Sequence, residues 1–255
     1  MGDLLKRSIT ENRGSWRTLG SNFWPSKSPG VMPRCINIAP CWFQQGHECY
    51  GPPPENPDDG FKPEIYATLK GERSLSTITA MQRPALLAST ALCIMHPQLY
   101  WASVRTQVEL SRWSVDQGLP DMHSLLKHWA SVYTGASVMC NRNSPDHRDP
   151  KCPPEAFDIL TCIRNYHHGV MQLTNLGIDL LYNLGVMVSY SGHLVRHGIN
   201  VAEGDRIVWA WFLQDSVHNY ARMPCPDYAW YNPIDLDTYK FVRYNQVDFA
   251  LYGTL

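Results

Sequence analysis

Apolar residues recur at three- and four-residue spacing over much of the chain, a pattern typical of helices that bury one side. The longest such stretch covers residues 153–220. It opens with Pro153-Pro154-Glu155, which suits the first turn of a helix. Between residues 170 and 195 the only formal charge is Asp179, so we expect a helix that is buried over most of its circumference. Residues 207–220 continue with a second helical pattern, and the stretch predicts a helical core.

Three further helices are predicted ahead of this core, at residues 74–95, 97–117 and 120–134. Prolines open the second and third, and glycines follow their ends, as helix boundaries prefer. The sequence therefore predicts a mainly α fold, an irregular helical bundle with extended N-terminal and C-terminal arms.

The two arms are predicted because neither end of the chain keeps a helical or an alternating period. Nine of the nineteen prolines fall within residues 1–63. We therefore divide the chain into an extended N-terminal arm (1–63), a helical body (64–222) and a C-terminal arm (223–255). An arm of this composition cannot bury enough apolar surface to order itself, so aromatic side chains must anchor it to a neighbouring subunit or to its own body. The candidate anchors are Trp16, Phe23, Trp24, Trp42 and Phe43.

Composition favours protein partners over nucleic acid. The 22 Lys and Arg residues nearly cancel the 23 Asp and Glu residues, so no global basic field attracts a polyanion. Nine Trp and thirteen Tyr are many, and large aromatic residues are enriched in the cores of interfaces. We expect other subunits of a large protein complex as partners and no nucleic acid.

Two apolar stretches, residues 84–104 and 169–188, approach the length of a membrane span. His96-Pro97-Gln98 interrupts the first, and Asp179 with several amide side chains makes the second costly in lipid. We expect buried helices in both, with contact between residues 169–188 and lipid left open.

The spacing of the cysteines gives weak indications of disulfide bonds. Cys152 and Cys162 enclose nine residues. This spacing resembles half of the twin C-x9-C pattern of small helical proteins that are oxidised in the mitochondrial intermembrane space. On one helix these two would lie ~15 Å apart, too far to bridge each other. Cys140, Cys152 and Cys162 are therefore disulfide candidates with partners elsewhere, and free buried thiols are the alternative.

The histidines are the candidate ligands if the protein binds a metal. His193 and His197 are four residues apart, so on a helix both imidazoles would project from one face, and His218 could join them. His147-Arg148-Asp149 matches the H-x-D part of the facial triad of non-haem iron proteins. That triad belongs to β jelly rolls and the following residues have a helical period, so we set it aside. Nucleophile elbows and phosphate-binding glycine loops are absent, and no cofactor is expected.

These observations favour a non-catalytic structural or accessory subunit of a large assembly over an enzyme. The first expectation is a membrane-associated respiratory-chain complex of the mitochondrion, on the inner membrane or the intermembrane-space side, with arms lying over neighbouring subunits. A viral coat protein is one alternative. A histidine-ligated metal-dependent oxidoreductase, built on His193, His197 and His218, is the other.

Overall fold

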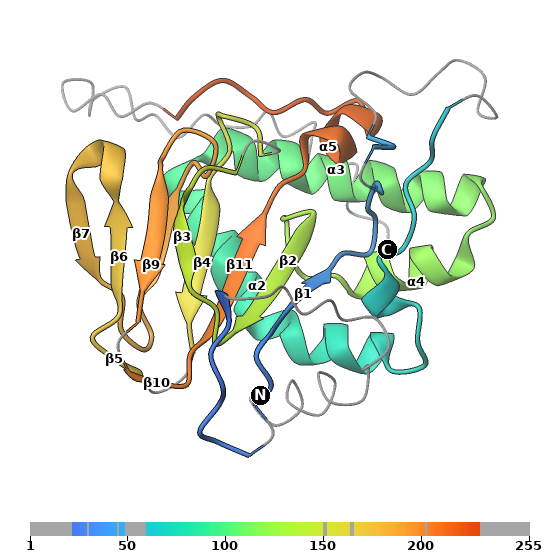
Figure 1. The fold of residues 1–255 in the computed structure, drawn as a ribbon. Coiled ribbons are helices and arrows are strands. Elements are labelled where there is room, and N and C mark those ends of the chain that lie inside the picture. The colour runs from blue at the N-terminus through green and yellow to red at the C-terminus, as the bar shows by residue number, and fades with distance from the viewer. Residues whose placement is uncertain are drawn as a thin grey trace.

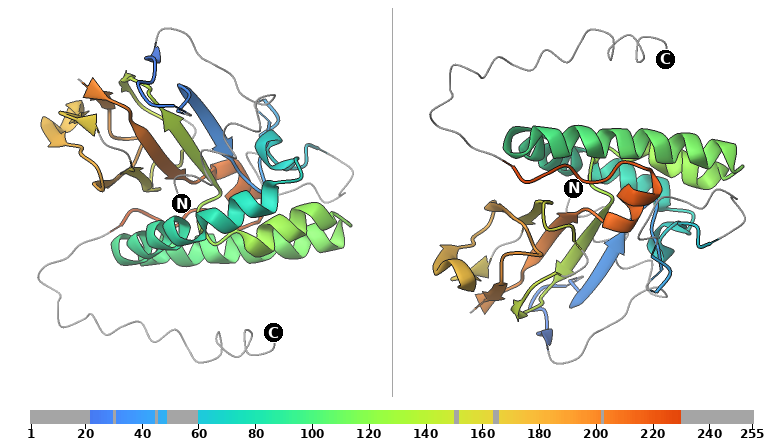
Figure 2. Two further views of the ribbon diagram at one scale, coloured as in Figure 1. Left: turned by 90° about the horizontal axis from the view of Figure 1, so that it is seen from below. Right: turned by 90° about the horizontal axis from the view of Figure 1, so that it is seen from above.

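The computed structural model describes residues 22–29, 31–44, 46–48, 60–149, 152–163, 166–201 and 203–229. Within these ranges the body consists mainly of two antiparallel β-sheets that pack on each other, with helices covering the outer face of the larger sheet (Figures 1 and 2). The predicted mainly α helical bundle is wrong.

The larger sheet has five strands and the smaller has four, with every pairing antiparallel. In spatial order the larger sheet contains β1 (Arg34–Ile38), β2 (Gly135–Cys140), β11 (Ile207–Phe212), β4 (Asp158–Cys162) and β8 (Met187–Tyr190). The smaller contains β3 (Ser144–His147), β9 (His197–Asn200), β6 (Val170–Leu173) and β7 (Ile178–Leu181). A separate pair joins β10 (Glu203–Gly204) to β5 (Tyr166–His167).

Three predicted helices are confirmed, although the third ends at His128, six residues before its predicted end at 134. They are α2 (Ser74–Met95), α3 (Pro97–Asp116) and α4 (Pro120–His128), and the last two begin at their prolines. A short helix, α5 (Asp215–Tyr220), follows β11. Single 3₁₀ turns, η3 (Ala67–Leu69) and η4 (Thr174–Leu176), complete the helical elements of the described chain.

The helical core predicted at residues 153–220 is instead a series of short strands. The strands of the larger sheet lie between the helices and the smaller sheet, so both of their faces are covered. A short apolar run such as Ile207–Phe212 can therefore be mistaken for part of a buried helix. Glycines recur every six to eight residues through the stretch, at turn spacing for strands: Gly169, Gly177, Gly185, Gly192 and Gly198. Gly177 and Gly185 have φ of 65° and 83°, which a continuing helix excludes.

Successive residues of β11 serve two different cores, as the period of a strand requires. Trp209 and Trp211 face the helices, where Trp129 lies 6.1 Å from Trp211 between ring centroids. Val208 faces the smaller sheet and packs with Met171 and other residues of the inner core. The larger sheet therefore separates an apolar layer under the helices from an inner space between the sheets.

The described anchors of the N-terminal arm contact the chain's own body. The Trp24 indole donates to the Gly204 carbonyl at 3.1 Å, and the ring of buried Phe43 lies 5.5 Å from that of Tyr220. Trp42 packs edge-on against Tyr66, and Phe23 forms an isolated bridge with Arg142. Trp16 lies outside the described residues. The same arm also supplies β1, and contact of the anchors with other subunits stays a prediction.

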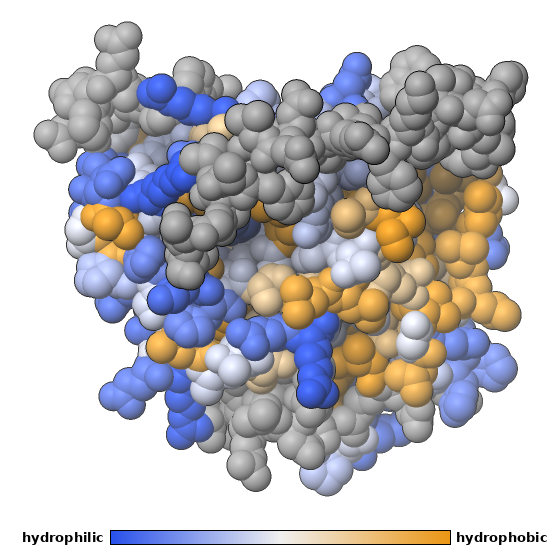
Figure 3. Space-filling view, turned by 180° about the vertical axis from the view of Figure 1, so that it is seen from behind, coloured by the Kyte–Doolittle hydropathy of each residue, from blue (hydrophilic) through white to orange (hydrophobic). Residues whose placement is uncertain are grey.

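One described helix, α2, is long and apolar enough to cross a membrane, although 33% of its apolar window is buried and core helices meet the same criterion. Figure 3 shows apolar side chains gathered on the side where the helices lie. The exposed apolar residues of α2 include Leu86, Leu87 and Ile94, whose exposed fractions are 56%, 59% and 78%. Residues 169–188 form mainly β6, η4 and β7 and no helix. Membrane contact stays a prediction.

His218 makes folding sensitive to acid. Burial lowers its pKa from the ordinary 6.5 to about 4. Between these values the unfolded chain binds the proton and the folded chain does not, so stability falls as pH decreases from 6.5 to 4, by up to about 3 kcal/mol. We expect the free energy of unfolding of His218→Gln, measured by urea unfolding at a series of pH values, to lack this decrease between pH 6.5 and 4. Exposed His128→Gln is the control, and parallel curves for wild type and His218→Gln would contradict the assignment.

Candidate metal centre

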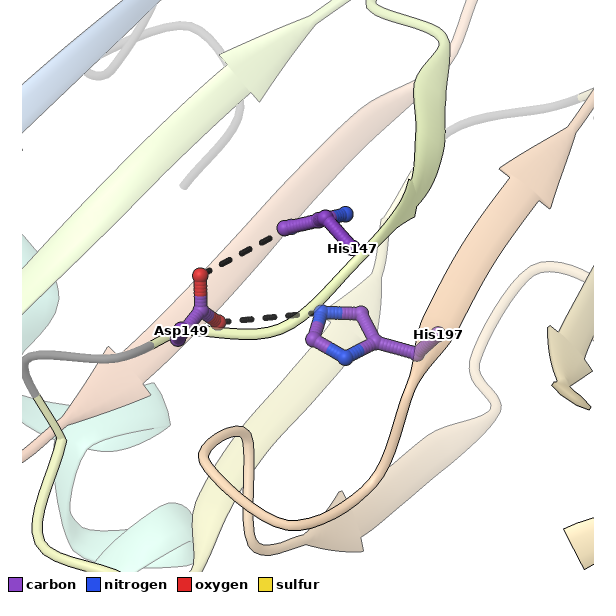
Figure 4. A group of neighbouring side chains, drawn as sticks. All are labelled: His147, Asp149 and His197. Atoms are coloured by element: carbon purple, nitrogen blue, oxygen red, sulfur yellow. Dashed lines mark ion pairs between the residues drawn. The ribbon is translucent and has the colours of Figure 1, made fainter. Parts of the chain in front are cut away.

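The pairing of β3 with β9 brings two histidines side by side. Ser144 lies opposite Ile199 and His147 opposite His197, with a one-residue shift between these two pairs. Such a bulge redirects side chains along a strand. Asp149 follows His147 by two residues, and side chains two apart in extended chain share a face. His147, Asp149 and His197 therefore point to one place (Figure 4).

The three side chains offer ligand atoms that all lie within 4.8 Å of one another. One carboxylate oxygen of Asp149 is 3.6 Å from Nε2 of His147, and the other is 3.6 Å from Nε2 of His197. The centroids of the two imidazole rings are 4.3 Å apart. Among the described residues, no other group of three or more such side chains converges in this way.

Both imidazoles have the tautomer that a metal ligand needs. Nδ1 of His147 is 2.6 Å from the Pro145 carbonyl, and Nδ1 of His197 is 2.9 Å from the Val195 carbonyl. A carbonyl only accepts, so each Nδ1 carries a hydrogen, and in the neutral ring the lone pair is then on Nε2, which faces Asp149. Metal-ligating histidines are oriented by hydrogen bonds of this kind.

Burial keeps His197 neutral. Its side chain is 7% exposed, and burial lowers its pKa, with the neighbouring His147 acting in the same direction. Behind the group lies Asp158 of β4, a second carboxyl whose pKa is raised to about 8 by burial and then by the charge of Asp149. At neutral pH Asp158 is therefore mainly protonated and adds little negative charge beside the three ligand side chains.

Two imidazole nitrogens and one carboxylate oxygen on one side of a site are typical ligands of iron(II) in non-haem oxygenases, which keep the remaining positions open. The residues present fit such an ion in donor type, in tautomer and in charge. Zinc accepts the same donors.

The group lies in the wall of a cavity of about 610 Å³ between the sheets. Its walls include Met139, Leu160 and Met171, so much of the surface around the ligands is apolar. His147 and Asp149 are nevertheless 35% and 46% exposed, so the ligands are reached by water from the open side of the cavity.

Arg206 is the cationic group of this cavity that is most enclosed. It lies just before β11 and is 4% exposed. Its Nη1 donates to the Arg142 carbonyl at 2.9 Å, but its Nε is buried without a partner. Among the described residues, no carboxylate lies within ion-pair distance of it. The guanidinium carbon also lies over the Tyr182 ring, 5.7 Å from its centroid. Because Arg206 has these neutral partners but no anionic one among the described residues, a ligand that brings a carboxylate into the cavity could form its ion pair.

The far end of the cavity has a different lining. Trp42 and Phe212 form an aromatic corner, with ring centroids 6.1 Å apart. Asn37 and Ser137 hydrogen-bond to each other on the sheet floor, and the buried side-chain oxygen of Gln214 has no partner. This end can accept an organic molecule with an aromatic or polar group.

Comparison with known proteins adds a likeness of fold at low similarity. No protein-family model and no curated protein matches the chain. Among solved structures 49 chains match. One is titled "NgTET1 in complex with 5mC DNA"; it is 14% identical with a TM-score of 0.46, over 90% of this chain and 94% of that chain. At this score the likeness carries no argument about function, which has to come from the residues of the site.

The structure brings only His197 of the three histidines proposed from sequence into the metal-binding group. His193 lies in the turn before β9, with Nδ1 2.8 Å from the Cys152 carbonyl. His218 is buried in α5 beside Thr106. The helix expected to align His193 with His197 does not form.

The three disulfide candidates lie in different parts of the fold, and Cys152 and Cys162 are free thiols. Cys140 ends β2, Cys162 ends β4, and Cys152 lies in the loop after Asp149. The helix that was to carry both Cys152 and Cys162 is absent.

Sequence reasoning set aside both His147 and Asp149 with the H-x-D motif, and it missed Arg206. The H-x-D spacing was the available signal, and it failed only because the neighbouring segment was interpreted as helical. Arg206 had no signal, since its importance comes from burial beside the site.

We expect the purified chain to bind one divalent iron or manganese ion, and His197→Ala to lower its affinity by about 10-fold or more, because one of three ligands is removed. Titration of the metal-free protein with Mn²⁺, followed by electron paramagnetic resonance, measures this. His167→Ala, an exposed histidine outside the group, is the matched control. Equal affinity of both variants would show that these residues do not form the site.

Proposed function

We propose that this protein is an iron(II)-dependent oxygenase that uses a 2-oxo acid as co-substrate. The observation that carries the proposal is the convergence of His147, Asp149 and His197 on the wall of a cavity between the sheets. Two histidines and one carboxylate, with the remaining positions open to the cavity, are the ligand set of mononuclear iron oxygenases.

A 2-oxo acid follows from Arg206 and from the electron balance. Insertion of one oxygen atom into a C–H bond takes two electrons from the substrate, whereas complete reduction of dioxygen takes four. A 2-oxo acid supplies the other two: it accepts the second oxygen atom, loses carbon dioxide and leaves as a shorter carboxylic acid. Its carboxylate would pair with the buried guanidinium of Arg206.

The chain's own residues position the reactants. When bound, iron(II) would supply the redox chemistry that activates dioxygen. The carbonyls of Pro145 and Val195 hold the two imidazoles in the ligating tautomer. Leu160 and Met171 supply an apolar wall on the inner side of the site. Trp42 and Phe212 stand where the organic substrate would enter the same cavity.

This reading replaces the predicted non-catalytic accessory subunit. That prediction and the coat-protein alternative both depended on a helical body, and the body is built of sheets. The metal-dependent oxidoreductase alternative is the one that the structure favours, with a different ligand set from the one predicted. Without the helical body, nothing in the described residues supports a respiratory-chain subunit. Mitochondrial localisation and a multi-subunit complex have not been tested.

Nucleic acid is considered only as a candidate substrate for an activity assay. The matching structure named above contains 5mC DNA. A methylated oligonucleotide and aromatic small molecules are both substrates to test, although the near-neutral charge of the chain led us to expect no nucleic acid.

We expect the iron-loaded protein to release carbon dioxide from 2-oxoglutarate, and Arg206→Lys to raise the KM for that acid about 10-fold or more. Lysine keeps the charge but lacks the planar fork that binds a carboxylate through two hydrogen bonds. Release of ¹⁴CO₂ from labelled 2-oxoglutarate measures both.

Exposed Arg105→Lys on α3 is the control and should leave the KM unchanged. Stoichiometric iron binding without any release of carbon dioxide would remove the 2-oxo acid from the proposal. A wild-type protein that binds no iron would overturn the proposal itself.

A further inference from the structure

The turn between β8 and β9, residues 191–196, forms hydrogen bonds with the segment that carries Asp149. The amide of Asp149 donates to the Gly192 carbonyl at 2.9 Å. His193 Nδ1 lies 2.8 Å from the Cys152 carbonyl, and the Ser191 hydroxyl donates to the Pro154 carbonyl at 2.8 Å. Three consecutive residues of the turn therefore bond to Asp149 and to the residues that follow it.

Gly192 also lies between two carboxyl groups. A Cβ added there would be 2.5 Å from Oδ2 of Asp158 and 3.0 Å from Oδ2 of Asp149. The first distance is shorter than real Cβ contacts allow. Asp158 is buried within β4, at 4% exposure, so its carboxyl has little room to shift. A larger residue at 192 must therefore displace the turn or one of the two carboxyl groups.

Asp149 is the ligand that most needs such support. His147 and His197 belong to paired strands, and each is fixed by its Nδ1 contact to a carbonyl. Asp149 lies beyond the end of β3, with 46% of its side chain exposed. Its position depends on the backbone of its loop, and the turn 191–196 holds that backbone.

We propose that Gly192 and His193 are positioning residues for the metal centre, which hold the Asp149 carboxylate where it completes the ligand set with His147 and His197. This inference rests on the proposed metal site. His193 acts through its hydrogen bond and not as a ligand. Gly192 acts through its carbonyl and through the absence of a side chain.

The experiment is a Mn²⁺ titration of metal-free variants, with the thermal midpoint of each metal-free protein measured in parallel. We expect Gly192→Ala to weaken Mn²⁺ binding by about 10- to 100-fold, the usual effect of losing support around a ligand. Leu194→Ala changes an exposed side chain of the same turn and should bind like wild type.

A second pair of variants keeps the test independent of how well Gly192→Ala folds. His193→Ala should weaken binding, and His193→Asn should restore it, because the asparagine side-chain amide can donate to the same carbonyl as imidazole Nδ1. A purely structural role would lower the thermal midpoint without this pattern in affinity.

The outcomes separate the two claims. If wild type binds Mn²⁺ and both Gly192→Ala and His193→Ala bind it equally well, the positioning role is refuted and the metal site stands. If wild type binds no Mn²⁺, the site and the role fall together.

Discussion

The centre depends on the register of one strand pair. β3 and β9 pair with a one-residue shift between Ser144 and His147, and this shift sets His147 opposite His197. In a strand, a slip of one residue turns every side chain to the other face. Without the bulge, one of the two imidazoles would point away from the cavity, and Asp149, two residues beyond His147, would turn with it. Local backbone geometry thus decides whether there is a site.

The larger sheet makes the surroundings of that site possible. Its outer face is closed by the helices, with Trp209 and Trp211 in the apolar layer, so its inner face is free to carry polar groups. Asp158, Asn37 and Ser137 all use this inner face, and Arg206 stands beside it. Removing these polar groups from water costs free energy. Burial of the apolar layer on the other side of the sheet offsets part of that cost. The cavity therefore depends on the burial behind it.

The local signals in the sequence were reliable where one boundary residue decides the structure. Pro97 and Pro120 correctly marked the starts of α3 and α4. The stretch from residue 153 to 220 failed because strands buried on both faces lose the alternation that identifies them, and the glycine spacing was the better guide. His147-x-Asp149 was visible in the sequence, but a short motif takes its meaning from the fold around it. Arg206 and Gly192 were not predictable, since burial and close approach between distant strands give them their roles.

The contrast between His193 and His197 shows why spacing alone misassigned the metal ligands. Four residues apart on a helix, they would share a face; here one lies in a turn and the other opens a strand. Their Nδ1 atoms contact different carbonyls, of Cys152 and of Val195. The first contact fixes the loop of a ligand and the second fixes a ligand itself. The same chemical group therefore serves the centre twice, and the backbone that it contacts decides which role it has.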